Sequence, residues 1–253
     1  MFTEAIVRQP CKNIINGITS ANLGVPDYNK AMAQHKQYVN ALIKCGLDVI
    51  ILKPDEEYPD SAFIEDTALL TPNCAVIMRP GAKSRKGETE AVSEVLKTYF
   101  SNIEEIKSPG TIEGGDIMMA GSHYYIGLSG RTNENGALQL IKILNNYGLT
   151  GSTIKLNNML HLKTGLAYLE NNNLLTAGEF INNRVFLKYN RLIIPEEENY
   201  AANCILVNDT VLVPDGYPAV KTLIKTAAYK ILTVDISEFK KLDGGLSCLS
   251  LRF

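Results

Sequence analysis

Three residue types in this chain of 253 residues are those that nucleophilic catalysis by a thiol requires. Cys248 follows the pair Gly244-Gly245, and His161 opens the polar segment that precedes an apolar run. Glu113 and Asp116 flank a second glycine pair. A glycine next to a strand lets a ligand approach the backbone closely. The set predicts a cysteine nucleophile with a histidine and with Glu113 or Asp116 as the carboxylate.

Each of these residues taken alone has a structural interpretation that is more common. A cysteine is usually an inert buried residue, and a histidine is usually held by hydrogen bonds in a structural role. Paired glycines can mark no more than a tight turn. Asp60, Glu65 and Asp66 lie in an acidic stretch that would by default be a solvated loop. The catalytic interpretation therefore depends on the fold bringing these positions together.

A repeated arrangement along the chain predicts such a fold. Five times a polar loop leads into a short apolar strand, and the anchor residues of these loops are separated by 48, 48, 42 and 45 residues. Periods of 20–50 residues are typical of repeat architectures such as propellers. We predict five ββαβ-type repeats in one domain, residues 1–253, with the anchors converging. The anchors are Glu65, Glu113, His161, Asn203 and Cys248.

The hydrophobic pattern predicts four helices between the strands of these repeats. Apolar residues recur every three to four positions, and capping residues such as Asp27 and stop signals such as Gly46 and Gly148 flank the runs. The predicted helices cover 27–45, 88–99, 132–147 and 218–229. Most strands are predicted as short apolar segments, among them 5–7, 47–52, 75–78, 124–127, 174–177, 205–207 and 211–213.

Composition excludes several other classes of protein. The chain has 25 basic and 27 acidic residues, so no basic surface for nucleic acid is expected. No apolar run approaches the length of a membrane span, and the first residues do not resemble a secretion signal. The five cysteines are scattered without a C-x-x-C pair, which predicts free thiols and no metal site. A cytoplasmic protein is expected, and whether it forms a homodimer stays open.

Seven linked motifs resemble those of the dimethylarginine dimethylaminohydrolases, in that family's order and spacing. The carboxyl-terminal Ser250-Leu251-Arg252-Phe253 resembles the bacterial branch in particular. The resemblance implies a five-bladed α/β propeller and hydrolysis of Nω-methylated arginine to citrulline without any cofactor. The motifs are PDSAFIED at 59–66, RPGAKSR at 79–85, TIEGGD at 111–116, RTN at 131–133, HLKT at 161–164, AANC at 201–204 and DGGLSC at 243–248.

The same resemblance implies a role for each matched position. It makes Cys248 the nucleophile, His161 the general acid and base, and Glu113 the carboxylate partner. The remaining positions would bind a small methylated arginine. Glu65 and Asp66 would surround the guanidinium, with Phe63 as its apolar wall, and Arg85 and Arg131 would clamp the α-carboxylate at a distance from that acidic pocket. Asp60 with the carbonyl of Ile18 would bind the α-amine, and the carbonyl of Leu242 would also contact the substrate.

Four other functions compete with this interpretation. Arginine deiminases use the same chemistry on unmethylated arginine, but they are usually longer and have His-x-Asp where this chain has His161-Leu162-Lys163. An amidinotransferase would pass the amidino group to an amine. A thiol protease would need an oxyanion hole and no acidic pocket. A binder without activity would have no use for an intact cysteine, histidine and glutamate.

Overall fold

The computed structural model describes all residues from 1 to 253 and contains five three-stranded sheets of one topology. In each sheet the middle strand is antiparallel to the strand that begins the repeat and parallel to the outer strand. The chain groups into two compact units, residues 65–164 and residues 1–64 with 165–253. The single domain expected from the sequence stays a prediction.

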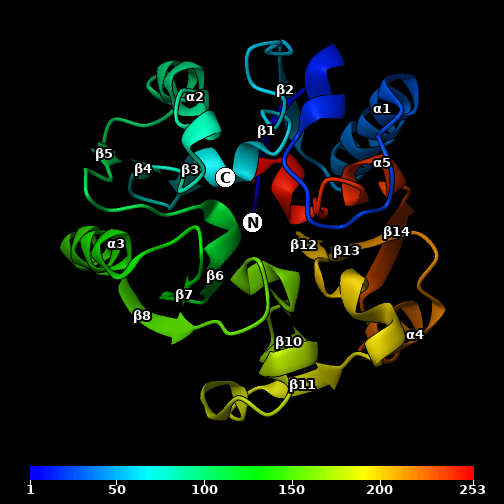
Figure 1. The fold of residues 1–253 in the computed structure, drawn as a ribbon. Coiled ribbons are helices and arrows are strands. Elements are labelled where there is room, and N and C mark those ends of the chain that lie inside the picture. Colours follow the sequence, from blue (N-terminus) through cyan, green and yellow to red (C-terminus); the bar gives the residue numbers. More distant parts are fainter. The chain divides into compact units, whose positions relative to one another are not determined.

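The unit of residues 65–164 holds two complete ββαβ repeats, which can be followed in Figure 1. Its own hydrophobic core lies between the sheets and helices and includes Val76, Ile126 and Leu140. The first repeat is β3 (Ala68–Leu70), β4 (Ala75–Ile77), α2 (Glu88–Leu96) and β5 (Ile103–Glu105). The second is β6 (Ile117–Ala120), β7 (His123–Leu128), α3 (Glu134–Asn146) and β8 (Thr150–Lys155).

The unit of residues 1–64 and 165–253 holds the other three sheets and two core clusters. One repeat is closed by the two chain ends, because β15 (Leu251–Arg252) pairs with β1 (Glu4–Arg8), which is followed by α1 (Tyr28–Lys44) and β2 (Asp48–Leu52). The next consists of β9 (Leu166–Tyr168), β10 (Asn173–Thr176) and β11 (Asn190–Ile193). The last is β12 (Ile205–Val207), β13 (Thr210–Pro214), α4 (Pro218–Thr226) and β14 (Lys230–Val234), followed by α5 (Ser237–Lys240).

The four predicted helices are present, and their ends have the predicted causes. Asp27 accepts a hydrogen bond from the N–H of Lys30 at 2.8 Å and so caps α1, while Gly46 has a φ of +89° directly after the helix. Asn133 caps α3 in the same way through Gly136. The repeat of β9 to β11 differs from the others, because 3-10 helices at Gly178–Phe180 and Arg184–Phe186 replace the α-helix.

Each sheet begins at a short 3-10 helix, and this common feature positions the predicted site. The turns are η2 (Ile64–Thr67), η4 (Gly114–Asp116), η5 (Leu162–Thr164), η8 (Glu196–Ala202) and η9 (Ser247–Leu249). The five anchor residues predicted from the repeat spacing lie within or next to these turns. The fold therefore carries each candidate side chain at the same structural position of its repeat.

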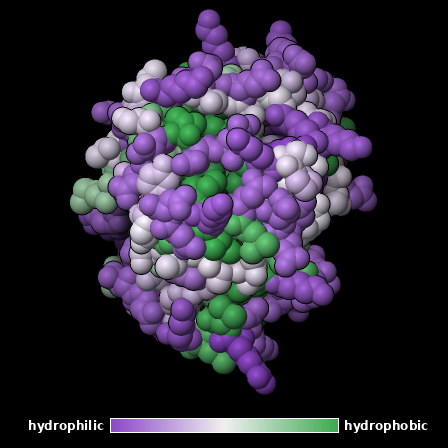
Figure 2. All heavy atoms as spheres, turned by 90° about the vertical axis from the view of Figure 1, so that its left-hand side faces the viewer, coloured by the Kyte–Doolittle hydropathy of each residue, from purple (hydrophilic) through white to green (hydrophobic).

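Hydrophilic side chains cover much of the surface, with hydrophobic side chains in patches between them on the face that Figure 2 shows. Isolated exposed apolar residues are ordinary on a protein surface. None of the helices has the length and apolar character needed to cross a lipid bilayer.

Candidate active site

His161 and Glu113 form a direct pair in the unit of residues 65–164. His161 Nε2 lies 2.8 Å from Glu113 Oε2, and the Glu113 side chain is fully buried. The imidazole packs against Gly115, where a Cβ would stand 2.7 Å from His161 Nδ1. Only glycine leaves room for the ring at this position. Of the two carboxylates that the sequence left open, Glu113 is therefore the one that contacts the histidine.

The surroundings of His161 favour its charged form. Burial alone would lower the pKa of the imidazole, but the hydrogen bond to Glu113 and the negative charges of Asp116 and Asp66 outweigh it. The pKa of His161 is raised from 6.5 to about 9. The residue is therefore an imidazolium at neutral pH and can donate a proton, whereas the sequence alone suggested an unperturbed value.

The raised pKa of His161 predicts a specific dependence of stability on pH. Since the folded-state pKa of about 9 exceeds the unfolded value of 6.5, the contribution is complete below pH 6.5 and is lost as the pH rises through 9. Urea unfolding should show the wild type losing about 3 kcal/mol more than His161→Gln over this range. Parallel pH profiles for the two proteins would mean that the imidazole is not held in its charged form.

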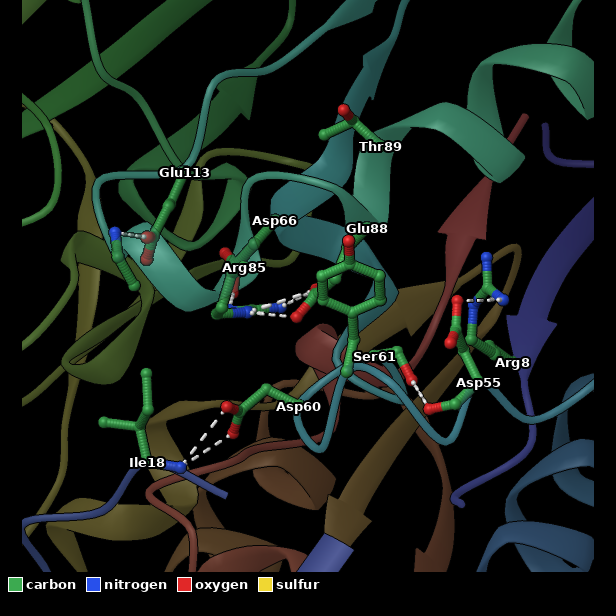
Figure 3. Close-up of polar contacts among 12 residues, drawn as sticks. Arg8, Ile18, Asp55, Asp60, Ser61, Asp66, Arg85, Glu88, Thr89 and Glu113 are labelled. Carbon is green, nitrogen blue, oxygen red and sulfur yellow. Dashed lines mark hydrogen bonds and ion pairs between the residues drawn. The ribbon is translucent and has the colours of Figure 1, made fainter. Parts of the chain in front are cut away.

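Arg85 occupies the centre of a buried network of charges in the same unit (Figure 3). Its Nη1 lies 2.6 Å from Asp66 Oδ2, and its Nε and Nη2 bind Glu88 at 2.8–3.1 Å. Burial alone would raise the pKa of Asp66, but the charges of Arg85 and His161 and the hydrogen bonds from Arg85 and Gly115 outweigh it and keep that pKa below its usual value. The expected separation of Arg85 from the acidic pocket is therefore wrong, because its guanidinium contacts Asp66 itself.

Two further ion pairs lie beside this network. Lys163 Nζ is 2.5 Å from Glu65 Oε1, and both side chains are mostly buried. Arg131 Nη1 is 3.7 Å from Glu113 Oε1, with 21% of its side chain exposed. Predicted anions and cations of the site thus neutralise one another, so a cationic substrate would have to rearrange some of these pairs.

Asp66, Glu113 and His161 form the group most suited to a metal ion. One ligand atom from each lies within 4.8 Å of the others. Carboxylate and imidazole are ordinary ligands of divalent cations. However, Arg85 contacts Asp66 and Arg131 faces Glu113, and these positive charges oppose the binding of a divalent cation. The arrangement favours the acid–base pair over a metal site.

Cys248 lies on η9 in the other unit, within a loop that several hydrogen bonds hold. The N–H of Gly245 points to the Cys248 sulfur at 3.4 Å. Asn203 binds Ser247 twice, through Oδ1 to its N–H at 2.8 Å and through Nδ2 to its hydroxyl at 3.1 Å. Tyr200 donates its hydroxyl to the carbonyl of Gly244 at 2.7 Å. The nucleophile candidate is thus fixed by neighbours on both sides.

The other four cysteines differ from Cys248 in their environment. Cys11, Cys45, Cys74 and Cys204 are buried, whereas Cys248 is partly exposed, and all five are free. Burial raises the pKa of each of the four buried thiols. They therefore stay protonated and are poor nucleophiles.

Asp60, Ile18 and Leu242 come together in the unit that contains Cys248. The N–H of Ile18 lies 3.0 and 3.3 Å from the two oxygens of Asp60 (Figure 3). A Cβ on Gly17 would stand 2.9 Å from both Asp60 and Leu242, which explains the glycine. The Ile18 amide thus holds the Asp60 carboxylate in place, and the role implied for the Ile18 carbonyl at the substrate α-amine stays a prediction.

Phe63 packs against the glycine pair that precedes Cys248. A Cβ on Gly244 would stand 2.2 Å from the Phe63 ring, and Phe239 meets the same ring edge-on at 6.1 Å between centroids. Only glycine allows this close contact between the ring and the backbone. Phe63 thus lies beside the Cys248 loop as an apolar surface.

The predicted residues therefore divide between the two units. Residues 1–64 and 165–253 contain Ile18, Asp60, Phe63, Leu242 and Cys248, and residues 65–164 contain Glu65, Asp66, Arg85, Glu113, Arg131 and His161. Sequence reasoning missed the partners Glu88 and Lys163, because a charged residue without a partner in view looks like ordinary surface. Asn203 was noticed as an anchor, but nothing in the sequence indicated its bond to Ser247.

Comparison with known proteins gives consistent results over the whole chain. A family model described as N,N dimethylarginine dimethylhydrolase, eukaryotic, matches residues 26–250. The N(G),N(G)-dimethylarginine dimethylaminohydrolase of Pseudomonas aeruginosa is 53% identical over 254 residues, which cover 100% of both chains. A second enzyme of that name, from Streptomyces coelicolor, is 31% identical over 98% of this chain and 96% of its own.

A solved structure shares the fold over its full length. It is a cysteine-to-serine variant of the Pseudomonas aeruginosa enzyme complexed with citrulline, with 52% identity, a TM-score of 0.99 and 100% coverage of both chains. A histidine-to-glycine variant of a dimethylarginine dimethylaminohydrolase, an adduct with S-methyl-L-thiocitrulline, matches equally well. Together with the five three-stranded sheets of one topology, this likeness confirms the predicted fold class, the five-bladed α/β propeller.

Proposed function

Because the chain belongs to the dimethylarginine dimethylaminohydrolase family, we propose that it hydrolyses Nω-methylated L-arginines to L-citrulline and an alkylamine. The contact between His161 and Glu113 carries the mechanistic part of this proposal. The relatives complexed with citrulline or joined to S-methyl-L-thiocitrulline support the substrate class. Their variants replace a cysteine and a histidine, the residue types of Cys248 and His161.

The chemistry of the guanidinium group explains why these residue types are needed. A guanidinium has a pKa above about 12, so the substrate arrives as a planar, delocalised cation. Its central carbon is electron-rich and resists neutral nucleophiles, so a thiolate is required. Carboxylates such as Asp66 and Glu65 can accept its N–H groups and orient that carbon.

In the proposed reaction the Cys248 thiolate attacks the guanidinium carbon and forms a C–S bond. His161, which is protonated at neutral pH, gives its proton to the departing alkylamine as the C–N bond breaks. The resulting thiouronium is attacked by water, and neutral His161 accepts the proton of that water. The C–S bond then breaks as the second proton of that water is lost to solvent, which releases citrulline and restores the thiolate. Glu113 stabilises the imidazolium in the steps in which His161 is protonated.

The amino-acid end of the substrate would be held by charges of both signs. Arg131 is partly exposed and can pair with the α-carboxylate, and Arg85 is the second cation that the family resemblance assigns to this group. Asp60 would attract the α-amine with the Ile18 and Leu242 carbonyls beside it, and Phe63 would cover the apolar part. These assignments follow the family resemblance.

A citrulline assay on four compounds tests the proposed function. Monomethylarginine and asymmetric dimethylarginine should give citrulline with stoichiometric alkylamine, whereas arginine and agmatine should react far more slowly. Arginine turned over as fast as the methylated compounds would identify an arginine deiminase. If none of the four compounds gave citrulline, the protein would be a binder of guanidino compounds without catalytic activity.

The proposal also includes the cellular location of the protein and its assembly. The five free thiols suit a reducing compartment, and we place the protein in the cytoplasm on that ground. We also propose that the chain acts as one catalytic domain on a small molecule, without a cofactor. A homodimer is compatible with this activity and would be recognised by its mass in solution.

A further inference from the structure

Asp116 is a buried carboxylate that the proposed mechanism does not use. It lies at the end of η4 and is fully inaccessible to solvent. Its Oδ1 accepts the N–H of Leu162, the residue after His161, at 3.0 Å. Its Oδ2 accepts the hydroxyl of Ser129 at 2.6 Å. One carboxylate thus holds two turns that are distant in the sequence.

The second of these turns leads directly to Arg131. Ser129 Oγ accepts the N–H of Arg131 at 3.0 Å and that of Thr132 at 3.2 Å. The N–H of Ser129 in turn binds the carbonyl of Thr132 at 3.1 Å. The hydroxyl of Thr132 accepts the N–H of Glu113 at 3.2 Å. The Arg131 turn is therefore tied to Asp116 and to the Glu113 segment at once.

The Asp116 carboxylate packs tightly against strand β7, and its negative charge acts on His161. A Cβ on Gly127 would stand 2.8 Å from Asp116 Oδ1, so strand β7 leaves no room for a side chain there. Burial raises the pKa of Asp116, which its hydrogen bonds partly offset. Its charge is among those that favour the imidazolium of His161.

We propose that Asp116 is a positioning residue of this enzyme, which fixes the turns of His161 and Arg131 relative to each other and stabilises the imidazolium charge. The inference rests on the proposed function, because that function gives His161 and Arg131 their roles. The charges of Glu113 and Asp66 also act on the imidazole and must be kept constant in a test. The ion pairs around them must be kept as well, and these involve Arg85, Arg131, Glu65 and Lys163.

The charge of Asp116 can be tested by NMR titration of the three histidines in the protein without substrate. Asp116→Asn keeps an acceptor for the Leu162 N–H but removes the charge, so the pKa of His161 should fall by about one pH unit. Asp209→Asn removes a carboxylate that is 64% exposed and serves as the control, with no shift expected. An unchanged His161 titration in Asp116→Asn would overturn the electrostatic role, whatever the enzyme's activity.

The positioning of Arg131 can be tested separately with Ser129→Ala. This variant leaves the Asp116 charge in place but breaks the link to the Arg131 turn. We expect KM for methylarginine to rise about five-fold or more, with the His161 titration unchanged and kcat nearly so. In Asp116→Asn, by contrast, the His161 pKa falls. The decrease of kcat at alkaline pH should therefore begin at a lower pH than in the wild type. If Ser129→Ala kept the KM of the wild type, the positioning of Arg131 by this turn would be rejected. If the His161 pKa fell in Asp116→Asn but the wild-type protein did not turn over methylarginine, only the proposed function would be rejected.

Discussion

Cys248→Ser removes turnover, with kcat lowered by about a thousandfold or more, because a serine hydroxyl is almost never ionised at neutral pH. His161, the base of the proposed mechanism, would not compensate, because the pKa of its imidazole is raised to about 9 and it is protonated at neutral pH. Citrulline release from methylarginine measures the effect. The variant should still fold, because the Asn203 and Tyr200 hydrogen bonds to the loop do not involve the sulfur.

Cys45→Ala is the matched control for this substitution. Cys45 is buried at the end of α1, and its pKa is raised by burial, so its loss should leave kcat unchanged. Iodoacetamide should label the wild type once, at Cys248, and substrate should protect that residue. Retention of even a tenth of wild-type kcat in Cys248→Ser would exclude it as the nucleophile.

The repeat architecture could be predicted because its signals are local. Apolar runs of strand length, Asp27 as a cap and glycines at helix ends are visible in sequence order. The outer strands β5 and β8 were missed, since Ile103–Glu105 and Thr150–Lys155 are polar and partly exposed and show no apolar run. An outer strand needs only backbone pairing on one side, so its sequence is weakly constrained.

The composition of the site could be predicted, but its electrostatics could not. The spacing of the anchors and the seven motifs indicated His161, Glu113 and Cys248. Neither reveals that Arg85 lies between Asp66 and Glu88, because such pairs depend on side-chain directions after folding. For the same reason the raised pKa of His161 emerges only from its three neighbouring carboxylates.

Arg85→Met should have the largest effect on stability of any single substitution in this site. It removes the guanidinium that binds Asp66 and Glu88, and leaves both carboxylates buried without it. Removing one partner of a buried ionic network costs about 3–5 kcal/mol, because the remaining charges stay desolvated. Urea unfolding at neutral pH measures this loss directly.

Two further variants distinguish this explanation from a general loss of packing. Arg85→Met combined with Glu88→Gln should recover part of the free energy of unfolding, since one unpaired charge is gone. Arg85→Lys keeps one positive charge but cannot bind both carboxylates as the planar guanidinium does, so an intermediate loss is expected. If the free energy of unfolding of Arg85→Met equalled that of the wild type, Asp66 and Glu88 would not be held as ionised carboxylates by this network.

Arg131→Met separates substrate binding from stability and gives the decisive test of substrate class. Arg131 is partly exposed and 3.7 Å from Glu113, which also accepts the N–H groups of Gly81 and Ala82, so little stability should be lost. If the cation binds an α-carboxylate, kcat/KM on methylarginine should fall about ten-fold or more, equivalent to about 1.4 kcal/mol. An alkylguanidine without the carboxylate should be affected much less. Equal losses on both compounds, or none on either, would reject the carboxylate clamp and favour a simple alkylguanidine as substrate.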